Sequence, residues 1–324
     1  MDDLGEEVDR VATATSFSGV VRLDRAGAPV FERAYGMAHR GLGVRNTVDT
    51  RFAIASGTKA LTALTVMTLV EDGTLGLDTT ARSVLGSDLP LIDDAVTVEQ
   101  LLAHRSGIGD YYDEDSDPSL PVAAQELENT EQYLPILDGY PTRFPPGTEF
   151  RYNNGAFVVL ALIAERASGV PFHDLVAQRV CAPAGLADTA FLRSDEPDRR
   201  MALGYLSQDG LRTNVFHLPV RGSGDGGVYT TVADWHLLWR AFFAGDIVSP
   251  KWVAEMVRPR SVYERSALRY GLGFWLHESS DAVFVEGYDP GVSFRSVCDP
   301  SGAFTYTVIG NTAAGAWPIA RLFL

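Results

Sequence analysis

The chain has 324 residues, of which 27 are Lys or Arg and 42 are Asp or Glu, so its formal net charge is −15. Hydrophobic residues make up 46% and charged residues 21%, which is typical of a folded globular protein and excludes a disordered chain. The acidic balance argues against nucleic acid or an anionic membrane surface as the partner, because phosphate binding requires a basic face.

The first seven residues are acidic and contain no apolar segment of the kind found in signal peptides. No apolar run reaches the roughly 18 residues that a membrane span needs. We therefore expect a cytoplasmic protein from the sequence as it stands, with a trimmed secreted form as the alternative. Cys181 and Cys298 lie far apart and outside any CxxC pair, which excludes a disulfide scaffold and predicts two small buried side chains.

Strands are expected at the beginning of the chain. Residues 17–23 and 29–35 are rich in β-forming side chains and flank a glycine-containing turn, which predicts a hairpin. Residues 56–72 have apolar side chains at helical spacing and are followed by Gly73, which predicts a helix.

Helices are expected in the middle and strands again near the end. Thr97 and Gln100 form a capping pattern for a short helix over 97–104. The apolar residues of 156–168 and of 231–244 have helical spacing. Further strands are predicted at 270–276, 282–286, 292–298 and 304–309.

This order of elements predicts an α/β protein whose two chain ends form one domain. We expect an α/β sandwich domain built from residues 1–75 and 211–324. The intervening residues, 76–210, are expected to form an inserted, mainly helical domain.

Several other motifs do not support the functions that they are usually associated with. Residues 222–227 (GSGDGG) fit GxGxxG but do not follow the first strand of a βαβ unit, which leaves a NAD-dependent enzyme only as an alternative. The six histidines form no HxH or HxxxH pair, so a histidine metal centre has no local support. Residues 291–293 lack the closing glycine of a lipase-type GxSxG elbow.

The acidic stretch 113–118 begins with the spacing of a calcium loop. Pro118 and Ala124, however, occupy the positions where that loop requires glycine and glutamate. We therefore expect a solvated acidic loop rather than a calcium site.

Ser56 and Lys59 form a Ser-x-x-Lys pattern at the start of the predicted helix. Residues i and i+3 of a helix share a face with Cβ atoms about 5–6 Å apart, so the ammonium can reach the hydroxyl. The helix N-terminus also favours negative charge developing at the serine. Both effects suit an acyl-transfer nucleophile, and the alternative is that Ser56 is an ordinary N-cap.

Tyr152 and Asn154 precede the second apolar helix. Side chains at i and i+2 of an extended segment share a face, so both residues can point the same way. A phenol there can exchange a proton with the serine or the leaving group, while the amide orients the lysine or the substrate. The alternative is a structural tyrosine packed on the helix start, with Asn154 as the N-cap.

Four blocks follow one another in the order Ser56–Lys59, Leu101–Ile108, Pro145–Gly155 and Gly226–Asp234. Over roughly residues 15–310 the chain therefore resembles the serine β-lactamase and penicillin-binding-protein superfamily. The similarity is greatest to class C β-lactamases, D,D-peptidases and their esterase relatives. This resemblance implies an antiparallel sheet flanked by helices, with a helical insertion.

The resemblance also implies roles for individual residues. Ser56 would be the acylated nucleophile, Lys59 its activator, and Tyr152 the base or proton relay, while Asn154 would bind the substrate amide and position Lys59. A free lysine titrates near pH 10.4, so it accepts a proton at neutral pH only if burial or another cation disfavours its charge. Whether Lys59 or Tyr152 is the base stays open. No cofactor or metal is implied, because these side chains supply the nucleophile and the proton transfer.

The third family motif departs from its pattern. Alignment on Pro290-Gly291 places Val285-Glu286-Gly287 where the family has Lys-Thr-Gly or His-x-Gly, so a valine replaces the cation that meets a substrate carboxylate. Gly287 still permits close approach of a substrate, and the N–H of Tyr288 is expected to join that of Ser56 in an oxyanion hole. Valine would leave an apolar wall, unless Arg295 or another nearby arginine restores the charge.

We therefore expect a serine hydrolase that forms an acyl-enzyme with a small ester or amide. An esterase or D-amino-acid peptidase is favoured over a β-lactamase, and the expected partner is a small-molecule ester or peptide substrate; the sequence does not indicate the oligomeric state. The alternative is a catalytically weak penicillin-binding-like protein with a binding or regulatory role. Val285 favours that alternative, and the retained Ser56, Lys59, Tyr152 and Asn154 oppose it.

Overall fold

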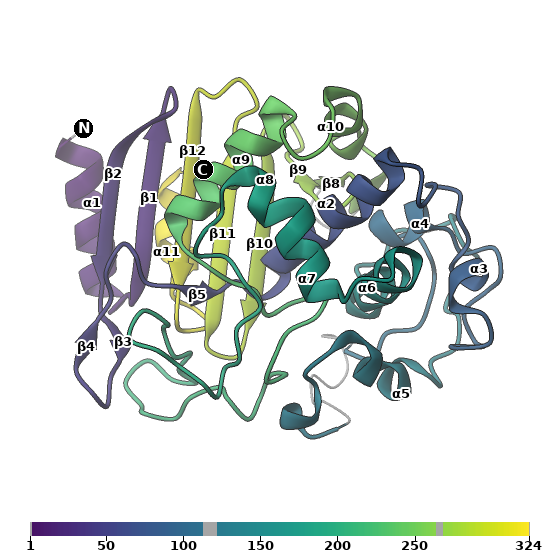
Figure 1. Ribbon diagram of the computed structural model, residues 1–324. Helices are drawn as coiled ribbons and strands as arrows, with labels where there is room; N and C mark the ends of the chain where they lie inside the picture. Colours follow the sequence, from purple (N-terminus) through teal and green to yellow (C-terminus); the bar gives the residue numbers. More distant parts are fainter. Residues whose placement is uncertain (1, 113–121, 264–267, 324) are drawn as a thin grey trace.

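The computed structural model describes residues 2–112, 122–263 and 268–323 (Figure 1). At its centre is an eight-stranded antiparallel sheet of order β2-β1-β12-β11-β10-β9-β8-β7, which confirms the predicted fold class. The strands are β1 Gly19–Arg25, β2 Ala28–Tyr35, β7 Ser261–Tyr263, β8 Leu268–Tyr270, β9 Trp275–Leu276, β10 Val283–Asp289, β11 Val292–Cys298 and β12 Phe304–Gly310. Short pairs outside it are β3 Met37–His39 with β4 Val44–Arg45, and β5 Phe52–Ala53 with β6 Tyr229–Thr230.

The local turn signals explain where the strands begin and end. The predicted hairpin is confirmed as β1 and β2, joined at Ala26 and Gly27, which both have positive φ. The single strand predicted over 270–276 is wrong, because the chain turns between β8 and β9. Gly273 makes this turn possible with φ +87°, a conformation that favours glycine.

Helices cover both faces of the sheet (Figure 1). On one face, α1 Asp2–Ala14 and α11 Ala316–Ala320 bury an apolar cluster that includes Phe284 of β10. On the other face, α2 Thr58–Glu71 and α9 Val232–Ala244 belong to a larger cluster that includes Val285 of the same strand. Successive side chains of β10 are therefore buried on opposite faces.

The remaining helices are α3 Ala81–Leu85, α4 Val98–Leu102, α5 Leu134–Leu137, α6 Asn154–Ser168, α7 Phe172–Val176, α8 Ala182–Ala184 and α10 Pro250–Met256. The predicted capping box of Thr97 and Gln100 is confirmed at α4. Gly169 ends α6 in the left-handed conformation. Helices α3 to α8 all lie within residues 76–210, but the larger apolar cluster joins this segment to the sheet, and the division into two domains stays a prediction.

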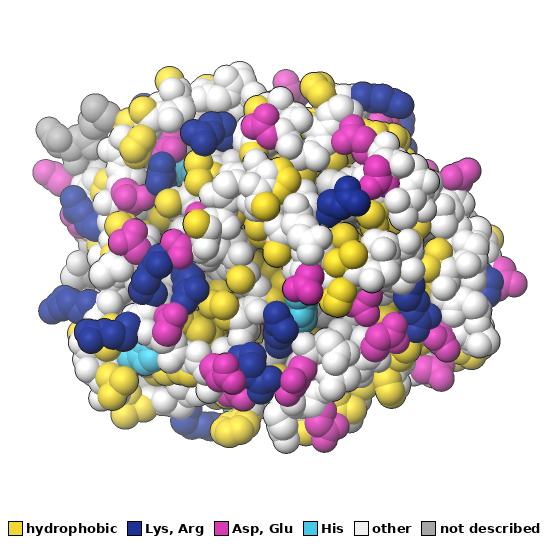
Figure 2. Space-filling model, in the orientation of Figure 1, with side chains coloured by type: hydrophobic (Ala, Val, Ile, Leu, Met, Phe, Trp, Pro, Cys, Tyr) yellow, Lys and Arg dark blue, Asp and Glu magenta, His cyan; other side chains and the backbone are white. Residues whose placement is uncertain are grey.

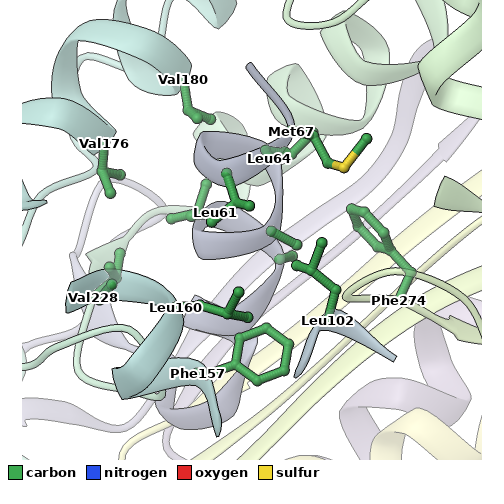
Figure 3. Close-up of a cluster of buried hydrophobic side chains, with 14 of the residues drawn as sticks. Leu61, Leu64, Met67, Leu102, Phe157, Leu160, Val176, Val180, Val228 and Phe274 are labelled. Atoms are coloured by element: carbon green, nitrogen blue, oxygen red, sulfur yellow. The ribbon is translucent and has the colours of Figure 1, made fainter. Parts of the chain in front are cut away.

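The helix α2 is buried on all sides (Figure 3). Its residues Leu61, Leu64 and Met67 are fully buried beside apolar side chains of α4 and α6, among them Leu102 and Phe157. A helix without a solvent-exposed face belongs in a core. The N-terminal end of α2, where Ser56 and Lys59 lie, is therefore held by a rigid packed environment.

Other features of the surface and interior bear on the sequence predictions. Acidic and basic side chains are interspersed over the face shown in Figure 2. Cys181 and Cys298 are buried and free, as predicted. Among the described residues no single helix has the length and apolar character to cross a membrane, although α6 and the bent continuation Phe172–Ala184 pass that test as a pair. The acidic stretch 113–118 lies outside the described residues.

Candidate active site

Ser56 lies in a tight turn between the short strand β5 and the core helix α2. The turn is the 3-10 helix η1 Ala55–Gly57, and Ala55 has φ +47°, an uncommon conformation for a residue with a side chain. No side chain caps η1 or α2, so the interpretation of Ser56 as an N-cap is wrong. Its hydroxyl instead accepts a hydrogen bond from Lys59.

Lys59 is 2% exposed and is held by three acceptors. Its Nζ atom donates to Ser56 Oγ at 2.9 Å, to Asn154 Oδ1 at 2.8 Å and to the carbonyl oxygen of Asp225 at 2.8 Å. The amide and carbonyl oxygens only accept, whereas the serine hydroxyl can also donate. When Lys59 is neutral, Ser56 can therefore donate its proton to Nζ while the other two bonds persist.

Asn154 is the first residue of α6. Its Oδ1 atom accepts from Lys59, and its Nδ2 atom donates to the carbonyl oxygen of Tyr112 at 3.0 Å. The N-cap of α6 is Asn153, whose Oδ1 accepts from the N–H of Ala156, so the proposed capping role of Asn154 is wrong. The Asn154 side chain is thereby free to orient Lys59.

Asp110 binds the backbone at the start of α6. Its carboxylate accepts the backbone N–H groups of Asn154 at 2.8 Å and Gly155 at 2.9 Å. Burial raises the pKa of Asp110 to about 6, although the backbone hydrogen bonds and Lys59 oppose the shift. Asp110 therefore fixes the backbone from which Asn154 reaches Lys59.

Tyr152 lies in the extended segment before α6, with its ring centroid 5.0 Å from Lys59 Nζ. The Tyr152 ring packs on the His104 ring, with 4.4 Å between the ring centroids, and stacks on the Trp275 ring, with 6.1 Å between the centroids. His104 also binds the backbone on both sides of Tyr152: its carbonyl oxygen accepts from Arg151, and its Nδ1 atom accepts from Asn153. Burial, with Lys59 nearby, lowers the pKa of His104 far below its usual value and keeps the ring neutral. The position of the Tyr152 ring beside Lys59 is thus fixed by packing and by backbone hydrogen bonds. The part of Tyr152 in proton transfer stays a prediction.

The third motif lies on β10, beside the Ser56 turn. A Cβ atom built on Gly287 would lie 2.0 Å from the carbonyl oxygen of Ile54 and 2.9 Å from the backbone nitrogen of Ser56. The absence of a side chain at Gly287 therefore allows β10 to approach the Ser56 turn closely, in addition to the close approach of a substrate that the sequence predicted. Tyr288 is 57% exposed in the cleft, and its part in an oxyanion hole stays a prediction.

Val285 is not on the cleft wall, so the prediction of an apolar wall at this residue is wrong. It is 3% exposed and belongs to the larger apolar cluster, because its side chain faces the helices that cover the sheet. The neighbouring Glu286 lines the cleft instead. Arg295, opposite it on β11, donates to its carboxylate at 3.3 Å, while burial raises the pKa of Glu286. Arg295 therefore neutralises a carboxylate of the protein rather than replacing the missing cation.

A cleft of about 1090 Å³ opens at Ser56. Its described wall includes five of the six predicted site residues, and the sixth, Lys59, is buried. The other polar lining residues include Arg105, Asp110, Arg143, Glu149, Arg151 and Arg260. Within 2–112, 122–263 and 268–323, no group of three or more His, Cys, Asp or Glu side chains is placed to hold a metal ion.

Three residues near Ser56 were not assigned a role from the sequence. His104 lies within one of the four ordered blocks, and Asp110 follows that block by two residues, so their proximity to the motifs was an available signal. Asp225 lies in the GSGDGG loop, where the carbonyl of Gly224 also accepts from Thr62 of α2. The structure places this loop against the Ser-x-x-Lys helix, an arrangement that only the tertiary fold reveals.

Comparisons with known proteins show the fold and the family of the chain. A penicillin-binding protein structure from Bacillus halodurans superimposes with a TM-score of 0.91 at 32% identity, covering 98% of both chains. The esterase EstB of Burkholderia gladioli is 34% identical over 56% of this chain and 48% of its own length. A D-aminopeptidase of Brucella anthropi is 28% identical over 81% of this chain and 49% of its own length. The profile of the Beta-lactamase family matches residues 8–323, and the chain therefore belongs to that family.

Proposed function

We propose that this protein is a serine hydrolase that forms an acyl-enzyme at Ser56 with small esters or amides, as an esterase or a D-amino-acid peptidase does. The observation that carries the proposal is the set of three contacts of Lys59. Of these three acceptors, Ser56 Oγ is the one that can reverse its hydrogen bond, and a base that activates a hydroxyl needs this arrangement.

The reaction proceeds in two steps. Ser56 Oγ attacks the substrate carbonyl and transfers its proton to neutral Lys59, while the N–H groups of Ser56 and Tyr288 stabilise the oxyanion. The proton then passes to the leaving group, by way of Tyr152 or directly. Water attacks the acyl-enzyme in the second step, with the same groups acting as the base.

The third motif favours substrates without a carboxylate beside the scissile bond. The Glu286 side chain in the cleft wall is paired with Arg295, and Val285 is buried and offers no cation there. The third motif therefore gives a substrate carboxylate no charge-assisted hydrogen bond at residue 285, whereas a neutral group needs none. The esterase and D-aminopeptidase relatives support the same choice.

The test is intact-mass analysis after exposure to a fluorophosphonate, p-nitrophenyl acetate and benzylpenicillin, with hydrolysis measured in parallel. We expect the fluorophosphonate to modify the wild-type protein and the Ser87→Ala control, in which an exposed serine is removed, but not Ser56→Ala. Turnover should be fast for the ester and slow for the penicillin. Modification of Ser56→Ala would contradict the proposal, and stable acylation without turnover would favour the binding or regulatory role.

A further inference from the structure

A second, smaller pocket of about 70 Å³ adjoins Ser56. It shares Ser56, Tyr112 and Asn154 with the large cleft, so a substrate bound in the cleft can reach both. A water molecule needs about 10–15 Å³ on this measure, so the pocket has room for a group of several non-hydrogen atoms. The large cleft leaves room for the leaving group, and the small pocket suits a compact acyl group.

The small pocket is acidic. Asp225 and Asp289 are the charged side chains among its described lining residues, and no lysine or arginine belongs to that lining. The large cleft, by contrast, is lined by several arginines. Tyr111 donates to the Asp225 carboxylate at 2.7 Å, and Lys59 donates to the Asp225 backbone carbonyl. Burial raises the pKa of Asp225, while Lys59 and the hydrogen bond from Tyr111 oppose that shift.

Tyr133 provides a second, independent sign of a ligand. It is 0% exposed and lines this pocket, yet its hydroxyl has no hydrogen-bond partner in the described structure. Burial, together with the negative charges of Asp225 and Asp289, raises the pKa of Tyr133. The hydroxyl therefore stays neutral, and it lies within the electrostatic influence of both carboxylates. The Ser194 hydroxyl in the same wall also lacks a partner. Buried hydroxyls without partners are costly, and a ligand with several N–H donors would satisfy them.

We propose that this pocket binds the ammonium group of an aminoacyl substrate, with Asp225, Asp289 and Tyr133 as its ligands. The substrates of this class are esters and amides of amino acids with a free α-amino group. The inference rests on the proposed function, because the carbonyl attached to that group must reach Ser56. Hydrogen bonds from an ammonium to carboxylates favour such substrates by about 10- to 150-fold in kcat/KM.

The test compares two substrates of equal shape, glycine ethyl ester and ethyl propionate, which differ by an ammonium in place of a methyl group. The assay is run at about pH 6.5, because α-amino groups titrate near 7.7–8.0 and are protonated there. The readout is the ratio of the two kcat/KM values. An ammonium group also activates the ester chemically, but this contribution is the same in every variant and cancels when the ratios are compared.

Asp225→Asn and Asp289→Asn keep the shape of each side chain and remove its charge. We expect each to lower the ratio about tenfold or more, and Tyr133→Phe to lower it less. The control is Asp281→Asn, which removes an exposed carboxylate outside both pockets and should leave the ratio unchanged. Asp225 and Asp289 lie on different segments, so misfolding of one variant leaves the other informative.

Binding is measured separately from turnover, as the thermal stabilisation of Ser56→Ala by glycinamide relative to propionamide. Preferential stabilisation by glycinamide that is lost in the Asp289→Asn background supports the pocket. Equal ratios in all variants together with equal stabilisation by the two amides would overturn the inference and leave ordered water as the occupant. In that case a Ser56-dependent hydrolysis of ethyl propionate would still support the proposed function, so the two proposals fail separately.

Discussion

Gly287→Ala should disable the enzyme through geometry alone. The added Cβ would lie 2.0 Å from the carbonyl oxygen of Ile54, whereas carbon–oxygen contacts settle at about 3.3–3.6 Å, so β10 and the Ser56 turn must separate by at least about 1.3 Å. Displacement of a reacting group by about 1 Å costs on the order of 100-fold in rate. Overpacking of a well-packed site also costs about 1–3 kcal/mol of stability.

The matched control is Gly41→Ala, because a Cβ atom on Gly41 meets nothing within 4 Å. Hydrolysis of p-nitrophenyl acetate and the urea midpoint are measured for both variants and the wild-type protein. We expect a loss of about 100-fold in kcat for Gly287→Ala with a lower midpoint, and wild-type values for Gly41→Ala. A Gly287→Ala protein with unchanged kcat and midpoint would show that the close approach of β10 to the Ser56 turn is not required.

Three further predictions concern neighbouring groups. If Lys59 and Tyr152 act with Ser56 as one unit, Lys59→Ala and Tyr152→Phe should each cost nearly as much kcat as the double variant, and additive losses would show that they act separately. Because burial raises the pKa of Asp110 to about 6, the folded state binds a proton on Asp110 more tightly than the unfolded chain does. The free energy of unfolding should therefore fall as the pH rises from about 4 to 6. Asp110→Asn should flatten that part of the profile of urea midpoint against pH. An unchanged slope would contradict this assignment. Glu286→Lys should raise the ratio of kcat/KM for nitrocefin to kcat/KM for p-nitrophenyl acetate about tenfold. Glu278→Lys makes the same change in charge at an exposed residue and should leave this ratio unchanged. If the two variants gave the same ratio, Glu286 would be excluded as a determinant of substrate charge.

Features with local signals were predicted well. The β1–β2 hairpin depends on a turn, α4 on the capping box of Thr97 and Gln100, and the Ser56–Lys59 contact on helical spacing. Each of these is determined by residues within a few positions of one another. The general position of the nucleophile could therefore be inferred before the fold was known.

Features that depend on distant contacts were not predicted. Asp225 lies 166 residues from Lys59, and its contribution is a backbone carbonyl, which every residue possesses. No residue type in the sequence marks such a contact. The aromatic packing of Tyr152 against Trp275 likewise joins two segments that are separated by more than 100 residues.

The third motif shows why alignment on Pro290-Gly291 did not identify the side chain that faces the cleft. In a sheet covered on one face, apolar and polar residues alternate and identify the buried face, but helices cover both faces of β10. Phe284 and Val285 are consequently both buried, and the pattern before Glu286 does not indicate which side of the strand faces the substrate. A lysine placed at Val285 would enter the apolar cluster rather than the cleft. We therefore expect Glu286, which lies in the cleft wall, to determine the preferred substrate charge on β10 rather than Val285.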